Sequence, residues 1–178
     1  MNPTRGFTLI ELIALMVILG LMAIVAVPQI FSPPTIRAHY VVRKMQSDIR
    51  YAQLLAMQRQ EPVLPLSSTP RIRVVFNLTN PPSSNGYQLE QEVGITWILL
   101  THPATRSDYV VNLNTGDYQG VSITTISLNA GNAVIFDSYG RPFIGSGSPL
   151  TEPAYVDVNG KYRLNFRAQT GKVDITNL

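Results

Sequence analysis

The first thirty residues limit the fold of this 178-residue chain more than any other segment. From Phe7 to Val27 the sequence reads FTLIELIALMVILGLMAIVAV, and Glu11 is its only ionisable residue. A helix rises about 1.5 Å per residue, so a helix of this length would span roughly the 30 Å of a hydrocarbon core. The sequence therefore predicts a transmembrane helix over residues 7–27.

The flanks of this segment favour an anchor that is kept in the mature protein. The apolar stretch continues to Pro28 without a clear small-x-small cleavage site, unlike a conventional secretory signal peptide. Arg5 precedes the stretch and no acidic residue does, so the positive-inside tendency places the N-terminus in the cytoplasm. We therefore expect a single-pass protein whose remaining chain lies outside the cytoplasm.

The hexapeptide MNPTRG followed by FTLIE resembles the type III signal of type IV prepilins and pseudopilins. The resemblance implies that the prepilin peptidase, a membrane aspartyl peptidase, cuts after Gly6 and methylates the new N-terminal residue, Phe7. It also implies a bacterial inner-membrane location, with a globular periplasmic domain, before assembly into a filament. The implied division is a leader over 1–6, a membrane and filament-core helix over 7–31, and a globular domain over 32–178.

Glu11 matches the acidic residue that this family carries in its mature helix. A lone carboxylate at membrane depth costs about 3 kcal/mol, so it marks a function. Phe7 lies four residues earlier and hence on the same helix face. The resemblance implies that Glu11 pairs with the N-terminal amine of a neighbouring subunit during assembly. A glutamate that reaches the cytoplasmic headgroups from an uncleaved anchor remains the alternative.

A second, amphipathic helix is predicted after residue 32. Ser32 is a suitable N-cap, and two prolines can occupy the first turn, where their missing N–H groups need no partner. The apolar residues that recur at helical spacing are Val41, Met45, Ile49, Ala52 and Ala56, whereas Arg43, Gln46 and Arg50 fall on another face. We expect a kink or short break near Ser32–Pro34.

Short β-branched stretches between turn residues follow this helix and predict strands. They cover residues 71–76, 87–92, 95–100, 109–113, 121–128, 133–137, 161–167 and 172–176. The prolines, serines and asparagines over 62–70 and 79–86 indicate loops. The predicted fold class is α+β and pilin-like: a long N-terminal helix packed on an antiparallel sheet or small β-sandwich.

Three further segments resemble the GspH/FimT group of minor pseudopilins and minor pilins. They are SDIRYAQLLAMQRQ (47–60), FDSYGRP (136–142) and LNFRAQTGKVDI (164–175). This resemblance implies a structural subunit near the tip of a type IV pilus or a type II secretion pseudopilus. The implied partners are other pilin or pseudopilin subunits, the prepilin peptidase and an inner-membrane assembly platform. A major pilin remains open on the sequence.

The residues that catalysis or metal binding would need do not converge in the sequence. Cysteine is absent, which excludes disulfides, thiolate metal sites and cysteine nucleophiles. His39 and His102 lack metal-site spacing, and Ser138 lacks a nucleophile elbow. The calcium candidates Asp108, Asp117, Asp137 and Asp157 form no dense acidic loop. We therefore expect a non-enzymatic protein without cofactor or metal; a membrane-tethered hydrolase is the enzyme alternative.

The basic residues near the C-terminus are the candidates for ligand binding. Lys161, Arg163 and Arg167 with Lys172 on the next strand could form one charged sheet face. Some FimT-like pilins capture DNA through a basic C-terminal region, so the resemblance implies a possible nucleic-acid contact here. A net charge of +3 gives no strong electrostatic footprint, and a solvated strand face is the other reading. A DNA- or surface-binding minor pilin is thus the alternative function.

Overall fold

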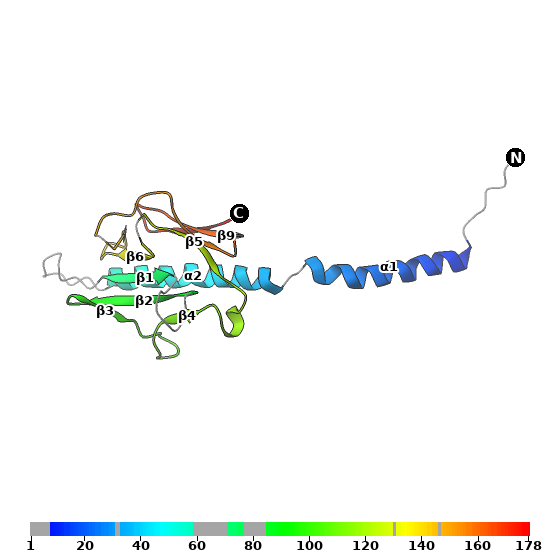
Figure 1. The fold of residues 1–178 in the computed structure, drawn as a ribbon, viewed down its shortest axis with the longest axis horizontal. Helices are drawn as coiled ribbons and strands as arrows, with labels where there is room; N and C mark the ends of the chain where they lie inside the picture. The colour runs from blue at the N-terminus through cyan, green and yellow to red at the C-terminus, as the bar shows by residue number, and fades with distance from the viewer. Residues whose placement is uncertain (1–7, 31–32, 59–70, 77–84, 130, 146) are drawn as a thin grey trace. The chain divides into compact units, whose positions relative to one another are not determined.

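The computed structural model of the protein describes residues 8–30, 33–58, 71–76, 85–129, 131–145 and 147–178. The chain divides into two compact units, Met1–Ile36 and Arg37–Leu178. Figure 1 shows the order of the elements along the chain. The leader predicted over 1–6 lies outside the described residues, and the predicted domain limits stay a prediction.

The first unit contains helix α1 (Leu9–Ile30). Its described side chains from Leu9 to Met22 are exposed and, apart from Glu11, apolar or glycine. Within the described ranges of the chain, no helix combines the length and the apolarity needed to cross a membrane. The span predicted over residues 7–27 stays a prediction.

Helix α2 (Pro33–Gln58) begins with two prolines, as predicted. Its predicted apolar face is confirmed, because Val41, Met45, Ile49, Ala52 and Ala56 are each at most 1% exposed. Gln46 departs from the prediction: it is half-buried, and its side chain donates a 2.7 Å hydrogen bond to the carbonyl of Val173. Gln46 therefore lies at the edge of the packed face and ties the helix to the last strand.

The break expected near Ser32–Pro34 concerns the segment that links the two helices. Helix α1 ends at Ile30 and α2 begins at Pro33. Ser32 itself lies outside the described residues, so the predicted N-cap and kink are not tested.

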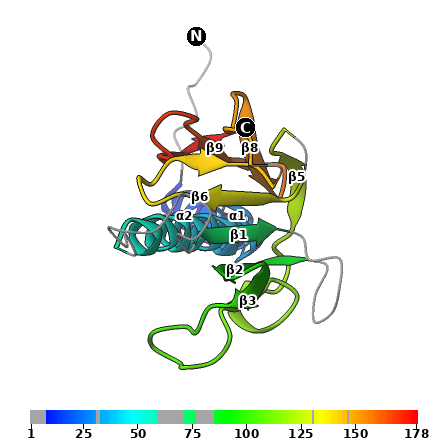
Figure 2. The same ribbon diagram turned by 90° about the vertical axis from the view of Figure 1, so that its left-hand side faces the viewer.

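The larger sheet is antiparallel and has six strands. In chain order they are β1 (Ile72–Phe76), β2 (Gly86–Val93), β3 (Thr96–Leu99), β4 (Val110–Asn112), β6 (Ala133–Phe136) and β7 (Pro142–Phe143). The strand order is β3-β2-β1-β6-β7, with β4 also paired to β2. Figure 2 shows β6, β1, β2 and β3 in this order.

The smaller sheet is also antiparallel and has four strands. They are β5 (Ile123–Ser127), β8 (Ala154–Val158), β9 (Tyr162–Phe166) and β10 (Val173–Asn177), in the order β10-β9-β8-β5. A short 3₁₀ helix, η1 (Gly116–Tyr118), precedes β5. The eight stretches predicted as strands all contain strands, whereas β7 and β8 were not predicted.

Strand β8 was missed because a proline precedes it and an aspartate interrupts its apolar pattern. Asp157 is nevertheless only 5% exposed. Arg163, its partner on β9, holds it with two side-chain hydrogen bonds of 2.7 and 2.9 Å. Charged residues that pair across strands can therefore occupy a buried position that the sequence pattern alone would reject.

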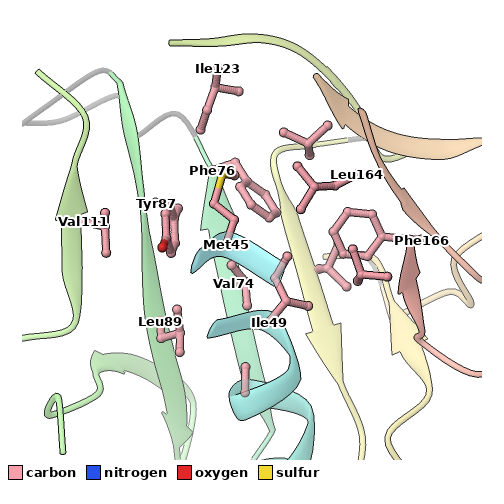
Figure 3. Packing of buried hydrophobic residues seen from close by; sticks show 14 of the residues in the cluster. Met45, Ile49, Val74, Phe76, Tyr87, Leu89, Val111, Ile123, Leu164 and Phe166 are labelled. Atoms are coloured by element: carbon pink, nitrogen blue, oxygen red, sulfur yellow. The ribbon is translucent and has the colours of Figure 1, made fainter. Parts of the chain in front are cut away.

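One hydrophobic core joins α2 and the two sheets. Met45 and Ile49 lie among side chains of β1, β2 and β9 (Figure 3). Phe76 of β1 is fully buried, and its ring lies 6.2 Å from that of Phe166 on β9 and 6.3 Å from that of Tyr87 on β2. The predicted α+β class, a helix packed on antiparallel sheets, is confirmed.

Candidate functional site

The N-terminal candidate site is described only from Thr8 onward. Gly6 and Phe7, the predicted cleavage and methylation positions, lie outside the described residues. Glu11 stands in the first turn of α1 and is exposed. Its Oε2 accepts hydrogen bonds from the backbone N–H of Thr8 at 3.4 Å and from the Thr8 hydroxyl at 3.5 Å.

These contacts give Glu11 a local role in addition to the predicted assembly role. The carbonyl of Thr8 accepts the N–H groups of Glu11 and Leu12, so Thr8 is the N-cap and Glu11 is the third helical residue. A threonine N-cap with a glutamate three positions later is the sequence of a capping box, and the Glu11-to-Thr8 bond is one half of that motif. The negative charge of the carboxylate also interacts favourably with the positive, N-terminal end of the helix dipole. In this chain Glu11 therefore helps to begin α1.

A buried polar network lies under α2 and was not predicted. Asp48 is 6% exposed and accepts a hydrogen bond of 2.5 Å from the hydroxyl of Tyr87, which is fully buried on β2. Lys44, one turn earlier on the helix, donates to the same oxygen of Asp48 at 2.8 Å. The carboxylate of Asp48 therefore joins the helix to the sheet, because it accepts hydrogen bonds from Lys44 on α2 and from Tyr87 on β2. A buried carboxylate needs such partners.

The tyrosines of this network have perturbed acidities. Burial raises the pKa of Tyr87 well above its usual value, and the neighbouring charge of Asp48 raises it further. The same two causes, in the same order, raise the pKa of Tyr109. Both hydroxyls therefore stay protonated under conditions where an exposed tyrosine ionises. Sequence reasoning missed the network because Asp48 lies 39 residues before Tyr87 in the sequence.

A cavity of about 390 Å³ opens beside this network. Its lining combines side chains from α2, from the β3–β4 loop and from η1, including Lys44, Asp108, Asp117 and Tyr118. Neither carboxylate of the two lining aspartates forms an ion pair or hydrogen bond with the residues that the structure describes. The charge of Lys44 is already balanced by Asp48, so the unpaired charge in the lining is negative.

The two histidines take part in local packing. His102 lines the cavity, and its Nδ1 accepts the backbone N–H groups of Ala104 and Thr105 at 3.2 and 3.3 Å. Its ring lies 4.5 Å from that of Tyr109. The ring of His39 meets Tyr162 edge-on at 5.7 Å. The structure thus gives each histidine a ring contact with a tyrosine.

The candidate cation-binding residues do not come together in the described parts of the chain. Asp137 pairs with Arg141 at 2.8 Å, and Asp157 pairs with Arg163 at 2.7 Å. Over the same described ranges, no group of three or more histidine, aspartate or glutamate side chains is placed to hold a metal ion.

Of the C-terminal basic residues, Arg163 lies on β9 and the other three lie beside β9 or β10, and most of them face acids. Arg163 holds Asp157 and stacks on the ring of Tyr155, with 3.7 Å between the guanidinium carbon and the ring centroid. Lys161 is exposed in the turn between β8 and β9. The charge of Arg163 is therefore balanced within the sheet.

The same holds for the other two basic residues. Lys172 pairs with Asp174 at 2.9 Å, and Arg167 lies 3.4 Å from Asp174 and 3.7 Å from Glu152. The hydrogen bond from Lys172 is the main cause that lowers the pKa of Asp174. Because each pairing acid reduces the local positive charge, the patch is a weaker anion site than the sequence implied. The nucleic-acid contact stays a prediction.

Comparison with known proteins identifies one feature, at the N-terminus. Residues 1–27 match the family described as the prokaryotic N-terminal methylation motif. No curated protein and no solved structure gives a significant match. The match includes Gly6, Phe7 and the Thr8–Glu11 helix start, and it supports a type IV pilin-like protein that is a substrate of the prepilin peptidase and assembles with other pilin subunits.

Proposed function

We propose that the chain is a minor subunit of a type IV pilus or a type II secretion pseudopilus, located near the filament tip. It is made as a prepilin in the inner membrane, cut after Gly6, methylated on Phe7 and inserted into the filament by the assembly platform. The observation that carries this proposal is the methylation motif over residues 1–27. The three segments similar to the GspH/FimT group support the minor-subunit assignment.

The contacts of the second unit support a structural rather than a catalytic role. Three of the candidate catalytic or metal-binding side chains make local contacts: His102 with a turn, and Asp137 and Asp157 with arginines. Helix α1 supports a filament-core role, because its exposed apolar side chains from Leu9 to Met22 would be covered by neighbouring helices. The membrane is the other environment that would cover them before assembly.

Processing of the leader tests the proposal. Gly6→Leu places a bulky side chain beside the cut, and we expect it to block cleavage in cells that carry a prepilin peptidase. Asn2→Leu adds the same side chain four residues earlier, away from the cut, and should be processed normally. Intact-mass measurement of the membrane fraction reports both events, since cleavage removes residues 1–6 and methylation adds one methyl group. Normal processing of Gly6→Leu would refute the assignment.

A further inference from the structure

Strand β3 forms an open edge of the larger sheet (Figure 2). Within the described structure its four residues, Thr96–Leu99, pair with β2 alone. Leu100, the next residue, donates its backbone N–H to the carbonyl of Leu89 on β2 at 2.9 Å. Because backbone groups of an antiparallel strand point to alternate sides, Trp97 and Leu99 direct their N–H and C=O groups away from β2. These groups have no hydrogen-bond partner among the residues that the structure describes.

The other sheet edges in the described ranges have features that hinder pairing with a further strand. Strands β4 and β7 have three and two residues, and β7 begins with a proline, which has no N–H to donate. The pairing of β5 is shifted by a bulge between Ile123 and Thr125. Strand β10 contains Asp174, and its first carbonyl, that of Val173, already accepts a bond from Gln46 of α2. Strand β3 has no charged residue, proline or bulge, so it is the edge best suited to pair.

Exposed apolar side chains surround this open edge. Ile95, in the turn between β2 and β3, is 97% exposed, and Val93 and Ile98 expose 51% and 44% of their surface. The register of β2 with β3 places Val93 and Ile98 on one face of the hairpin. We call these three side chains, together with the outer side of β3, the β3 edge. Apolar side chains beside an open strand are typical of a surface that another protein covers.

The charged side chains next to the β3 edge are paired within the sheet. Arg71 binds Glu92 with two hydrogen bonds of 2.6 and 2.7 Å, and the side chain of Arg73 pairs with that of Glu90. The guanidinium carbon of Arg73 also lies 4.2 Å from the centroid of the Trp97 ring. The β3 edge therefore provides backbone hydrogen bonds and apolar contacts, and its partner does not need a charge.

We propose that the β3 edge binds an extended segment of a neighbouring, different pilin subunit, which adds a strand to the larger sheet. An extended backbone matches the alternating N–H and C=O groups of β3. In strand addition of this kind, main-chain hydrogen bonds give affinity and alternate side chains give specificity. The segment should be uncharged and apolar at every second position, so that it covers Val93 and Ile98.

A different subunit is the occupant that the proposed function favours, and the inference rests on that function. The methylation motif over residues 1–27 implies assembly with other pilin subunits. Two β3 edges from two copies would instead form a closed, two-fold pair, which requires a second copy beside the first. A minor subunit near the tip has other pilin subunits as its neighbours. One β3 edge therefore meets one strand of a different subunit.

Photo-cross-linking in intact cells tests which protein covers the β3 edge. The full-length chain carries the substitution Ile95→p-benzoylphenylalanine, because this position is exposed and lies in the turn, outside the strand pairing. In cells that assemble the filament, we expect an adduct with another protein that has an N-terminal methylation motif, identified by its peptide masses. The matched control is Leu178→p-benzoylphenylalanine, at a position 60% exposed after the last strand of the smaller sheet. It should not give this adduct.

Two substitutions of Leu99 test whether the backbone of β3 makes the contact. Leu99→Pro removes the N–H that points away from β2 and leaves the bonds to β2 in place. Leu99→Ala shortens the same half-buried side chain but keeps the N–H. In the chain with the cross-linker at position 95, we expect Leu99→Pro to lower the adduct yield about tenfold, whereas Leu99→Ala should stay within about twofold. Ile98→Lys places a charge in the apolar patch without a proline, and it should lower the yield as well.

The outcomes separate this inference from the proposed function. If the wild-type chain keeps residues 1–6 in its intact mass, the proposed function fails and the inference fails with it. If the chain is processed but position 95 gives no adduct with another pilin subunit, or only an adduct of two copies of this chain, the docking is wrong. Equal yields from Leu99→Pro and Leu99→Ala, or an unchanged yield from Ile98→Lys, would also overturn strand addition at β3.

Discussion

The side-chain amide of Gln53 donates a hydrogen bond of 2.8 Å to the backbone carbonyl of Gly140. The same nitrogen donates to the carbonyl of Thr170, also at 2.8 Å. The three residues belong to the three separate segments that resemble the GspH/FimT group, over 47–60, 136–142 and 164–175. One helix side chain therefore fixes two turns that lie 30 residues apart in the sequence.

Replacement of Gln53 should loosen this junction. Gln53→Ala removes both donors and leaves two carbonyls to find other partners, so we expect the free energy of unfolding to fall by about 1–3 kcal/mol. Chemical denaturation of the full chain in detergent measures the change. Gln58→Ala, on an exposed position of the same helix, is the control and should stay within about 0.5 kcal/mol of wild type. Equal stabilities of the two variants would show that the junction contributes nothing.

Two glycines allow the close approach at this junction to be tested separately from backbone strain. Gly171 and Gly160 have nearly the same φ, +66° and +60°. A Cβ on Gly171 would lie 2.7 Å from Gln53 Nε2 and 2.7 Å from the carbonyl oxygen of Gly140, whereas a Cβ on Gly160 would meet nothing within 4 Å.

We therefore expect Gly160→Ala to cost only the strain of a left-handed backbone, about 1–2 kcal/mol. Gly171→Ala should cost this strain plus about 1–3 kcal/mol for the steric overlap, part of which is with backbone. Denaturation midpoints of the two variants give the comparison. A cost for Gly171→Ala no larger than that for Gly160→Ala would contradict the close packing.

The buried network under α2 should behave as a coupled unit. Asp48→Ala leaves the Tyr87 hydroxyl buried without its acceptor, and we expect a loss of about 3 kcal/mol of stability. In the Asp48→Ala background, Tyr87→Phe should cost about 1–3 kcal/mol less than in the wild type, because the bond is already gone. Asp117→Ala, at an exposed and unpaired position, is the control. Additive losses would mean that the bond carries no net energy.

The raised pKa of Tyr87 predicts a stability that depends on alkaline pH. The unfolded tyrosine ionises near pH 10, whereas the folded one ionises well above that value. The contribution is thus complete below about pH 10 and is lost as the pH rises from there toward the folded pKa. We expect stability to fall as the pH rises above about 10, and to fall less steeply in Tyr87→Phe. Tyr139→Phe, at a position 70% exposed, should keep the wild-type slope.

Two substitutions of Glu11 separate its capping role from its predicted assembly role. Glutamine can still accept the N–H of Thr8 as the third residue of a capping box but carries no charge, whereas alanine can do neither. If the carboxylate meets the N-terminal amine of a neighbouring subunit, both Glu11→Gln and Glu11→Ala should be cleaved and methylated but recovered poorly in filaments. Intact mass and filament recovery report the two steps. Normal assembly of Glu11→Gln would leave capping as the function of Glu11.

The sequence predicted the parts of this protein that depend on local pattern. The α2 positions Val41, Met45 and Ile49 are buried as their spacing indicated, and the eight stretches predicted as strands contain strands. The N-terminal motif could also be recognised from the sequence, because its residues are contiguous. The family match covers the same segment. In these cases the whole pattern, either a periodic spacing of apolar residues or a motif, lies within one continuous stretch of the chain.

Only the tertiary structure decided which distant polar residues meet. Asp48 and Tyr87 form a buried bond across 39 residues, and Gln53 reaches two turns 87 and 117 residues away. Arg163 pairs with the buried Asp157 of strand β8, and the predicted basic face is largely balanced by the acids that folding places beside it. A polar side chain has no preferred partner until the sheets form. The sequence by itself therefore determined where the chain is helical or extended. The packing of the helix and the sheets determined which charged side chains are paired.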